Sequence, residues 1–269
     1  MPNFTTLQVE ARNHVGLIWF NRPEIHNALN DVVLGELRAA LKAMARDRGV
    51  RALVLAGHGK SFCAGGDLNY MKRAAGYTKA QNERDAAALA ETLWILASLP
   101  KPTVARVHGN AYAGGMGFVA ACDIAVASTE AVFCLSEVKL GLIPATISPY
   151  VIRAMGERAA SRYFLTAERF DAAEAYRIGF VQDICPPDEL DARVNEVLGH
   201  LVQGGPRALA ESKKLLALSG GTRLTPAVRG QTAKMIAATR ASAEGREGIA
   251  SFLEKRKPAW VNELQLGEQ

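Results

Sequence analysis

Two glycine-rich stretches decide how this chain folds: KSFCAGGDL at residues 60–68 and HGNAYAGG at residues 108–115. Each follows an apolar run typical of a buried strand, at 51–56 and 102–107. Neighbouring parallel strands place the loops that follow them at one end of a sheet, where α/β proteins bind ligands. Backbone without side chains at Gly66 and Gly115 can present N–H groups to a ligand, and two donors aimed at one oxygen form an oxyanion hole. We therefore expect either two tight turns or one site built from both loops.

The segments around these stretches alternate between strand-like and helix-like patterns. Strands are expected at 7–11, 15–20, 51–56, 102–107, 124–127, 132–135 and 180–184. Helices are expected to begin at N-caps at Asn30 or Asp31, at Thr78 and at Asp171, and a short apolar helix follows the loop 109–115. Such alternation predicts an α/β core with parallel strand pairing.

The strand pattern stops near Pro186. Helices are expected at 187–204, 206–218 and 225–257, with glycine pairs at 204–205 and 220–221 as breaks. This shift predicts a core at residues 1–200 and a helical region at 201–269. Because no Pro/Ser-rich linker separates the two parts, we expect them to pack together.

The composition excludes several classes of protein. Apolar residues make up 49% and charged residues 22%, which excludes disorder, and the longest stretch without a charged residue, 107–122, is too short and polar to span a bilayer. The amino-terminal segment has no export-signal pattern, and none of the four cysteines forms a CxxC pair. The five histidines lack paired metal-ligand spacing, and Gly59-Lys60-Ser61 lacks the earlier glycine of a P-loop. We expect a cytoplasmic protein without metal or membrane contact.

The net charge of +5 is unevenly distributed. The segment 206–258 carries eleven Lys or Arg against four Glu, so it is +7 and the rest of the chain is −2. A basic region beside a near-neutral body indicates an anionic partner, such as a phosphate-bearing ligand, nucleic acid or an acidic subunit. A solvated helical face with scattered basic side chains explains the same count equally well.

Six strings in order give the chain a family resemblance. They are NRPE with NAL at 21–29, SFCAGGDL at 61–68, HGNAYAGGMGF at 108–118, CDIA at 122–125, the segment 133–144 and EGIASFLEKRKP at 247–258. Together they resemble the crotonase, or enoyl-CoA hydratase/isomerase, superfamily over most of the chain. The resemblance implies a crotonase-like spiral of ββα units, followed by a C-terminal helical region that builds a homotrimer or a hexamer. It implies an acyl-CoA thioester as substrate, with no separate cofactor because coenzyme A is part of that substrate.

The resemblance also implies roles for particular residues. The N–H groups of Gly66 and Gly115 are expected to hold the thioester carbonyl. The remaining residues expected to bind the coenzyme A portion are His26, Ala64, Asp67, Leu68, Lys255 and Lys257. The two lysines would contact the phosphates of coenzyme A, which is bound either to the same subunit or to a neighbouring one.

The carboxylates depart from the hydratase pattern. Hydratases of this family place two glutamates around a water; here the second survives as Glu137, but the first position is Gly117. One carboxylate suffices to move a proton at a carbon next to a polarised thioester, whereas positioning water with one is harder. Ala145 stands where other members carry an aspartate for dehalogenation or dienoyl isomerisation, which counts against both. Some other group would have to help Glu137 to position and activate the water. Tyr70, Lys72 and Arg73 are candidates for this role only because they follow Leu68 in the sequence.

Three functions remain open from the sequence. We expect hydration of a 2-enoyl-CoA with Glu137 as general acid/base. The residues at 61–73 and 142–150 resemble those of bacterial methylglutaconyl-CoA hydratase-like members, which indicates a branched or methylglutaconyl-type substrate. Isomerisation of a 3-enoyl-CoA needs only one carboxylate and is the alternative. A CoA- or RNA-binding protein without catalysis is the third, but the basic segment lacks interleaved aromatic residues for base stacking, so nucleic acid is not the expected partner.

Overall fold

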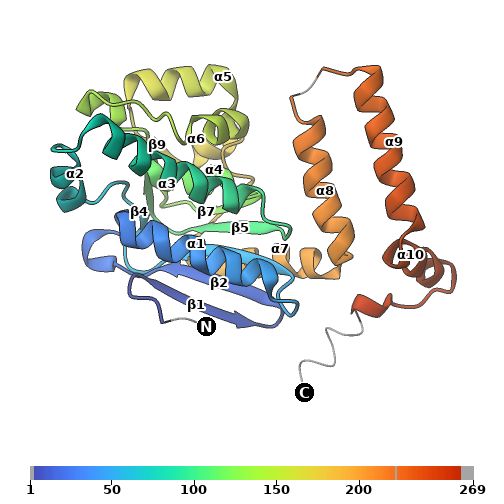
Figure 1. Ribbon diagram of the computed structural model, residues 1–269. Coiled ribbons are helices and arrows are strands. Elements are labelled where there is room, and N and C mark those ends of the chain that lie inside the picture. Colours follow the sequence, from blue (N-terminus) through green and yellow to red (C-terminus); the bar gives the residue numbers. More distant parts are fainter. Residues whose placement is uncertain (1–2, 222, 262–269) are drawn as a thin grey trace.

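The computed structural model describes residues 3–221 and 223–261 and is organised around two sheets (Figure 1). The larger sheet has the order β1(Leu7–Arg12), β2(Val15–Phe20), β3(Ala52–Gly57), β5(Thr103–Val107), β7(Ile124–Ser128) and β10(Asp183–Cys185). Only β1 and β2 pair antiparallel; the other neighbours are parallel. The pairing of β3 with β5 confirms that the strands before the two glycine-rich stretches are parallel neighbours.

The smaller sheet lies partly within those stretches. It has the order β4(Ser61–Cys63), β6(Asn110–Tyr112), β8(Val132–Cys134) and β9(Phe170–Asp171). Strands β4 and β6 fall where turns were expected, because each has only three residues and lies within a glycine-rich stretch that is typical of a turn. Successive units give one strand to the larger sheet, one to the smaller sheet and then a helix. This is the expected spiral of ββα units.

The helices are set by local capping and by one apolar face each. Asn30 caps α1 by accepting the Val33 N–H at 3.0 Å, and Thr78 forms a capping box with Gln81 at the start of α3. The helices of the core are α1(Asp31–Arg46), α2(Leu68–Ala74), α3(Lys79–Ala97), α4(Gly114–Ala121), α5(Ser148–Thr166), α6(Ala172–Arg177) and α7(Leu190–Gln203), with the 3-10 turns η1(Pro23–Ile25), η2(Glu137–Leu140) and η3(Pro187–Glu189).

Two parts of the helical prediction need correction. Helices α2 and α5 were not predicted, and the single helix expected at 225–257 is two helices, α9(Pro226–Ala241) and α10(Ala243–Leu253). Ser242 separates them because its backbone is extended and its hydroxyl oxygen accepts the Gly245 N–H at 3.0 Å. A serine inside a helical pattern is a new N-cap here.

The core has two layers, one on each face of the larger sheet. Helix α1 buries Leu37, Leu41 and Met44 on one face. Helix α7 covers the other face with Leu190 and Val194, which pack in a cluster with residues of β2, β3, β5 and β7. Among the described helices none is long and apolar enough to cross a membrane.

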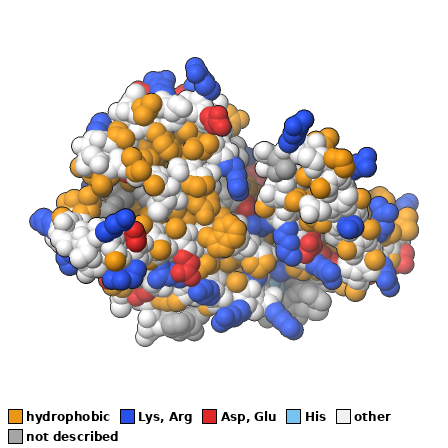
Figure 2. Space-filling view, turned by 45° about the horizontal axis from the view of Figure 1, so that its top comes forward, with side chains coloured by type: hydrophobic (Ala, Val, Ile, Leu, Met, Phe, Trp, Pro, Cys, Tyr) orange, Lys and Arg blue, Asp and Glu red, His pale blue; other side chains and the backbone are white. Residues whose placement is uncertain are grey.

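Beyond α7 the chain forms an arm of α8(Pro206–Ser219), α9 and α10 that stands beside the core (Figure 1). The arm is attached by Arg51, which donates to the Gly204 carbonyl at 2.6 Å, and by Lys213, which pairs with Asp123 at 2.6 Å. On the face shown in Figure 2, the basic side chains are spread over the arm rather than gathered in one patch. The division at residue 200 stays a prediction.

Candidate active site

The two glycine-rich stretches open into a cavity of about 920 Å³. Its walls come from the start of α1, the β4–α2 connection, α3, the start of α4, and η2 with the loop after it. Most of the lining side chains are apolar, and the ionisable ones are Tyr70, Asp85 and Glu137. A cavity of this size with few polar groups is typical of a small-molecule site.

The backbone at Gly66 directs an N–H group away from its neighbouring strand segment. Leu29 donates to the Gly65 carbonyl at 2.7 Å and accepts from the Asp67 N–H at 2.9 Å, which forms a parallel bridge. In extended backbone the N–H of the residue between those two partners points the opposite way. Gly66 also lines the cavity. Its N–H is therefore available to a ligand there.

The second glycine-rich stretch supplies the start of α4. Gly114 and Gly115 are the first two residues of this helix, so their N–H groups have no partner within it, and the positive end of the helix dipole lies there. Gly114 lines the cavity. A Cβ on Gly115 would lie 2.4 Å from the Cys63 carbonyl oxygen. The absence of a side chain at Gly115 thus lets α4 lie directly against β4, which brings the two stretches together.

Glu137 is one of the two carboxylates that line this cavity. It is the first residue of η2 and lines the same cavity as Gly66 and Gly114. Its Oε2 is buried and has no hydrogen-bond partner among the described residues. Burial raises the pKa of the carboxyl, and its own backbone N–H lowers it by a smaller amount. A buried acceptor without a partner is unusual in a folded protein and marks a site where a ligand completes the bonding.

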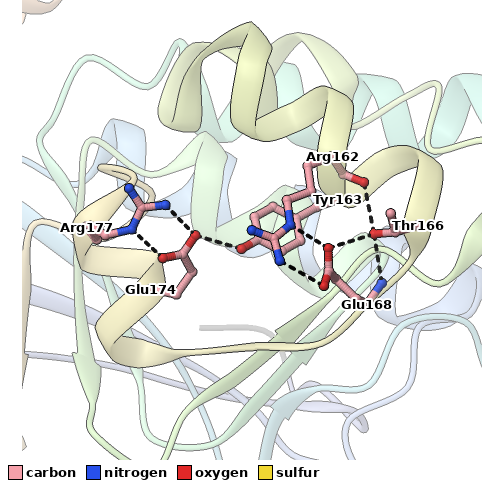
Figure 3. Close-up of polar contacts among 6 residues, drawn as sticks. All are labelled: Arg162, Tyr163, Thr166, Glu168, Glu174 and Arg177. Carbon is pink, nitrogen blue, oxygen red and sulfur yellow. Dashed lines mark hydrogen bonds and ion pairs between the residues drawn. The ribbon is translucent and has the colours of Figure 1, made fainter.

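The turn that carries Glu137 is held from two sides. Gly141 closes η2 in the left-handed conformation (φ 70°), and Lys139 Nζ donates to the Ala167 carbonyl at 2.8 Å. Ala167 follows α5 in a region fixed by a polar network in which Tyr163 donates to Glu174 at 2.7 Å (Figure 3). The other members of that network are Arg162, Thr166, Glu168 and Arg177. Glu137 therefore lies on a turn that is fixed by these contacts.

The position of the missing glutamate is filled by another side chain. A Cβ on Gly117 would lie 2.2 Å from Ile147 Cγ2 and 2.8 Å from Ile147 Cβ. Ile147 is buried and precedes α5. The space into which a side chain at 117 would enter is therefore occupied. Ala145, at the position where the resemblance implies an aspartate in other members, lines the cavity and carries no charge.

The residues expected to bind coenzyme A are only partly brought together. Ala64 and Leu68 line the cavity with Gly66. The Asp67 carboxylate is engaged inside the protein: it pairs with Arg22 at 2.9 Å and caps α2 through the Asn69 and Tyr70 N–H groups. Asp67 is therefore a residue that shapes the β4–α2 connection.

The remaining predicted contacts lie farther out. His26 is exposed, its carbonyl accepts the Ala64 N–H at 3.0 Å, and its ring lies 3.0 Å from the Ser61 hydroxyl. Lys255 and Lys257 follow α10 on the arm, whereas the cavity lies beside α2 and α3 at the other end of the molecule (Figure 1). One chain does not bring these lysines to the cavity. Arg73 pairs with Asp31 at 3.2 Å.

Asp85 was not predicted from the sequence. It lies on α3, lines the cavity and is half-buried. The segment around it matches none of the six family strings, and an aspartate in a polar stretch of helix gives no signal by itself. No cluster of three metal-binding side chains occurs at residues 3–221 or 223–261.

Comparison with known proteins decides the family. The model of the family described as enoyl-CoA hydratase/isomerase matches residues 10–263. The chain belongs to the enoyl-CoA hydratase/isomerase family. A putative enoyl-CoA hydratase of Thermus thermophilus is 36% identical, covering 94% of this chain and 99% of its own. The 2,3-dehydroadipyl-CoA hydratase of Escherichia coli is 33% identical, covering 94% and 97%.

Solved structures of the family share the fold. An enoyl-CoA hydratase from Shewanella pealeana superposes with a TM-score of 0.93 at 41% identity, covering 96% of both chains. A putative enoyl-CoA hydratase/isomerase (crotonase) from Legionella pneumophila has a TM-score of 0.90 at 43% identity, covering 96% of this chain and 100% of that one. The crotonase-type fold and membership of an acyl-CoA enzyme family are thereby confirmed.

Proposed function

We propose that the protein hydrates a 2-enoyl-CoA by stabilising a thioester enolate. The observation that carries this proposal is a buried carboxylate oxygen of Glu137 without a protein partner, in the same cavity as the free N–H of Gly66. The second donor is an N–H of the first turn of α4, where Gly115 is the donor expected from the sequence and Gly114 lines the cavity. Together they supply an acid/base group and an anion-stabilising pair.

The proposed steps use only these groups. The thioester oxygen accepts hydrogen bonds from both N–H groups, which draws electron density from the double bond and stabilises negative charge on that oxygen. Glu137 accepts a proton from the attacking water as the water oxygen bonds to the β-carbon. The protonated Glu137 then returns this proton to the α-carbon as the enolate collapses, which regenerates the carboxylate. Loss of one donor from such a pair typically costs about 3–4 kcal/mol of transition-state stabilisation.

Isomerisation of a 3-enoyl-CoA is the second candidate, and the Gly117–Ile147 contact favours it. Because Ile147 fills the space beside Gly117, no second carboxylate enters from that position. Moving a double bond requires removal of a proton from one carbon and its return to another, which Glu137 alone performs. Hydration requires in addition that water be held in place.

The proposed substrate is an acyl-CoA whose coenzyme A portion is not a separate cofactor. Ala64, Gly66 and Leu68 line the cavity beside the expected thioester position. The acyl chain is proposed to be branched or of the methylglutaconyl type, because the apolar side chains that line the cavity can contact the hydrocarbon part of such a chain. The name of the Escherichia coli relative shows that a family member acts on a dicarboxylic acyl group.

A homotrimer or hexamer is also proposed. The arm exposes Phe252 and Leu253 at 82% and 72%, and apolar side chains this exposed on one element favour contact with another subunit. An oligomer would also be the route by which Lys255 and Lys257 reach coenzyme A phosphates. A cytoplasmic location remains a prediction from the sequence.

Purified protein incubated separately with crotonyl-, 3-methylglutaconyl- and 3-hexenoyl-CoA tests the proposed reaction. Hydration predicts loss of the ultraviolet absorbance of a conjugated substrate and formation of a 3-hydroxyacyl-CoA. Migration of the double bond of 3-hexenoyl-CoA, with no hydroxyl product from either conjugated substrate, would replace hydration by isomerisation. No turnover of any of the three would leave the binding-only function.

A further inference from the structure

The α3 wall of the cavity carries a carboxylate that the proposed reaction does not use. Asp85 lines the cavity with Asn82, Ala86 and Leu89 of the same helix, and Leu34 of α1 contributes to the same lining. The helix therefore presents one ionisable group to the cavity, together with one amide and two apolar side chains. Its place on α3 separates it in sequence from both glycine-rich stretches and from Glu137.

Asp85 has no neutralising partner. Across the described ranges it makes neither an ion pair nor a hydrogen bond, and burial together with the nearby Asp31 raises its pKa. Two arginines of neighbouring elements have other partners: Arg73 pairs with Asp31, and Arg38 donates to the Ala88 carbonyl and the Thr92 hydroxyl. No basic side chain of the described residues pairs with the Asp85 carboxylate, which lines the cavity.

The cavity as a whole has charges of one sign only. Its ionisable lining residues are Tyr70, Asp85 and Glu137, and its described lining includes no Lys, Arg or His. A second carboxylate on the ligand would lose its hydration there and find no cation or guanidinium to replace it. It would also meet two acids of the same charge. An uncharged hydrocarbon chain incurs neither cost and buries against the leucines of the wall.

We propose that Asp85 is a specificity-determining residue that makes this site select acyl-CoA thioesters with an uncharged, apolar acyl chain and reject those with a distal carboxylate. This inference rests on the proposed function in one respect, that the cavity receives the acyl group of an acyl-CoA. It favours a branched or straight hydrocarbon chain over a methylglutaconyl-type chain. Discrimination arises from a repulsive group placed against the competing ligand, which is a common source of specificity.

Binding of saturated acyl-CoAs tests the inference without requiring turnover. Hexanoyl-CoA and adipyl-CoA have the same chain length and differ in a terminal methyl against a carboxylate. Calorimetric titration of the full-length protein at pH 8 is expected to show hexanoyl-CoA bound at least about tenfold more tightly, because the terminal carboxylate of adipyl-CoA meets a like charge in the cavity. The variant Asp85→Asn keeps the side-chain shape without the charge and is expected to reduce this ratio at least about threefold.

Glu83→Gln is the matched control. Glu83 lies on α3 two residues from Asp85, is exposed and pairs with Lys79, so its neutralisation removes the same charge from the same helix outside the cavity. It is expected to leave the ratio unchanged. Equal or tighter binding of adipyl-CoA by the wild type overturns the inference, and so does an Asp85→Asn ratio equal to that of the wild type. Selective binding of hexanoyl-CoA with no hydration of any enoyl-CoA supports the inference and contradicts the proposed reaction.

Discussion

Substitution of Gly117 by alanine tests whether Ile147 fills the position of the missing glutamate. The added Cβ would lie 2.2 Å from Ile147 Cγ2, which is far inside van der Waals contact, and 3.6 Å from Leu93 Cδ2, which is ordinary contact. Overpacking of this kind typically costs about 1–3 kcal/mol. Replacing glycine within a helix by alanine contributes about 1 kcal/mol in the other direction. The two effects must be separated.

Gly35→Ala supplies that separation. Gly35 lies within α1, and a Cβ built there meets nothing within 4 Å, so its substitution reports helix propensity alone. We expect Gly35→Ala to raise the free energy of unfolding by about 1 kcal/mol and Gly117→Ala to fall about 1–3 kcal/mol below that control. Denaturant unfolding at one fixed protein concentration provides the comparison, because assembly makes stability depend on concentration.

A double-mutant cycle identifies the contact. Ile147→Ala removes the atom at 2.2 Å but leaves the Cβ at 2.8 Å, so relief is partial. The single change is expected to cost about 2–5 kcal/mol through the cavity it leaves, and Gly117→Ala should cost less in its presence by about 0.5–2 kcal/mol. Stabilisation by Gly117→Ala equal to that of Gly35→Ala would refute the reasoning. Strict additivity of the two changes would show that Ile147 is not the obstacle.

Other substitutions test the site's construction. Because burial raises the pKa of Glu137, the acidic limb of the kcat–pH profile is expected to lie above the range of an ordinary glutamate, and stopped assays across pH should show it; a limb in the ordinary range would contradict this. Gly115→Ala should lower the melting temperature more than Gly114→Ala. A Cβ at position 115 would meet the backbone oxygen of Cys63, whereas a Cβ at position 114 would meet only the end of a leucine side chain. Equal melting temperatures of the two variants would count against the packing role of Gly115. Asp67→Ala removes the buried pair with Arg22 and the cap of α2, and denaturant unfolding should show a loss of about 2–4 kcal/mol; a loss below about 0.5 kcal/mol would show that the pair contributes little.

Much of the fold was predictable because its long elements have clear periodic patterns. The strands before the glycine-rich stretches, the caps at Asn30, Thr78 and Asp171, and the helical end of the chain were all expected and are observed. The three-residue strands β4 and β6 were not, since pairing between distant segments forms them and no local pattern announces it. The break at Ser242 was missed because serine is compatible with both a helix interior and an N-cap.

The candidate site was predictable only in part, for a similar reason. Glu137, Gly66 and the α4 glycines belong to strings that the family resemblance covers, and the structure places Glu137, Gly66 and Gly114 on one cavity. Asp85 reaches the same cavity from α3, through tertiary packing that no motif records. The filling of the space beside Gly117 by Ile147 is also a long-range contact, so the sequence indicated a missing carboxylate without showing what had replaced it.

The central claim is that Glu137 alone carries protons to and from the substrate, and kinetics of the variant Glu137→Gln test it most directly. With crotonyl-CoA, turnover is expected to fall by about 10²–10⁴-fold, the usual contribution of a positioned proton-transfer group. Binding of the unreactive butyryl-CoA should stay within about threefold, because the amide retains the size of the side chain. A wild-type rate of turnover in this variant would contradict the account.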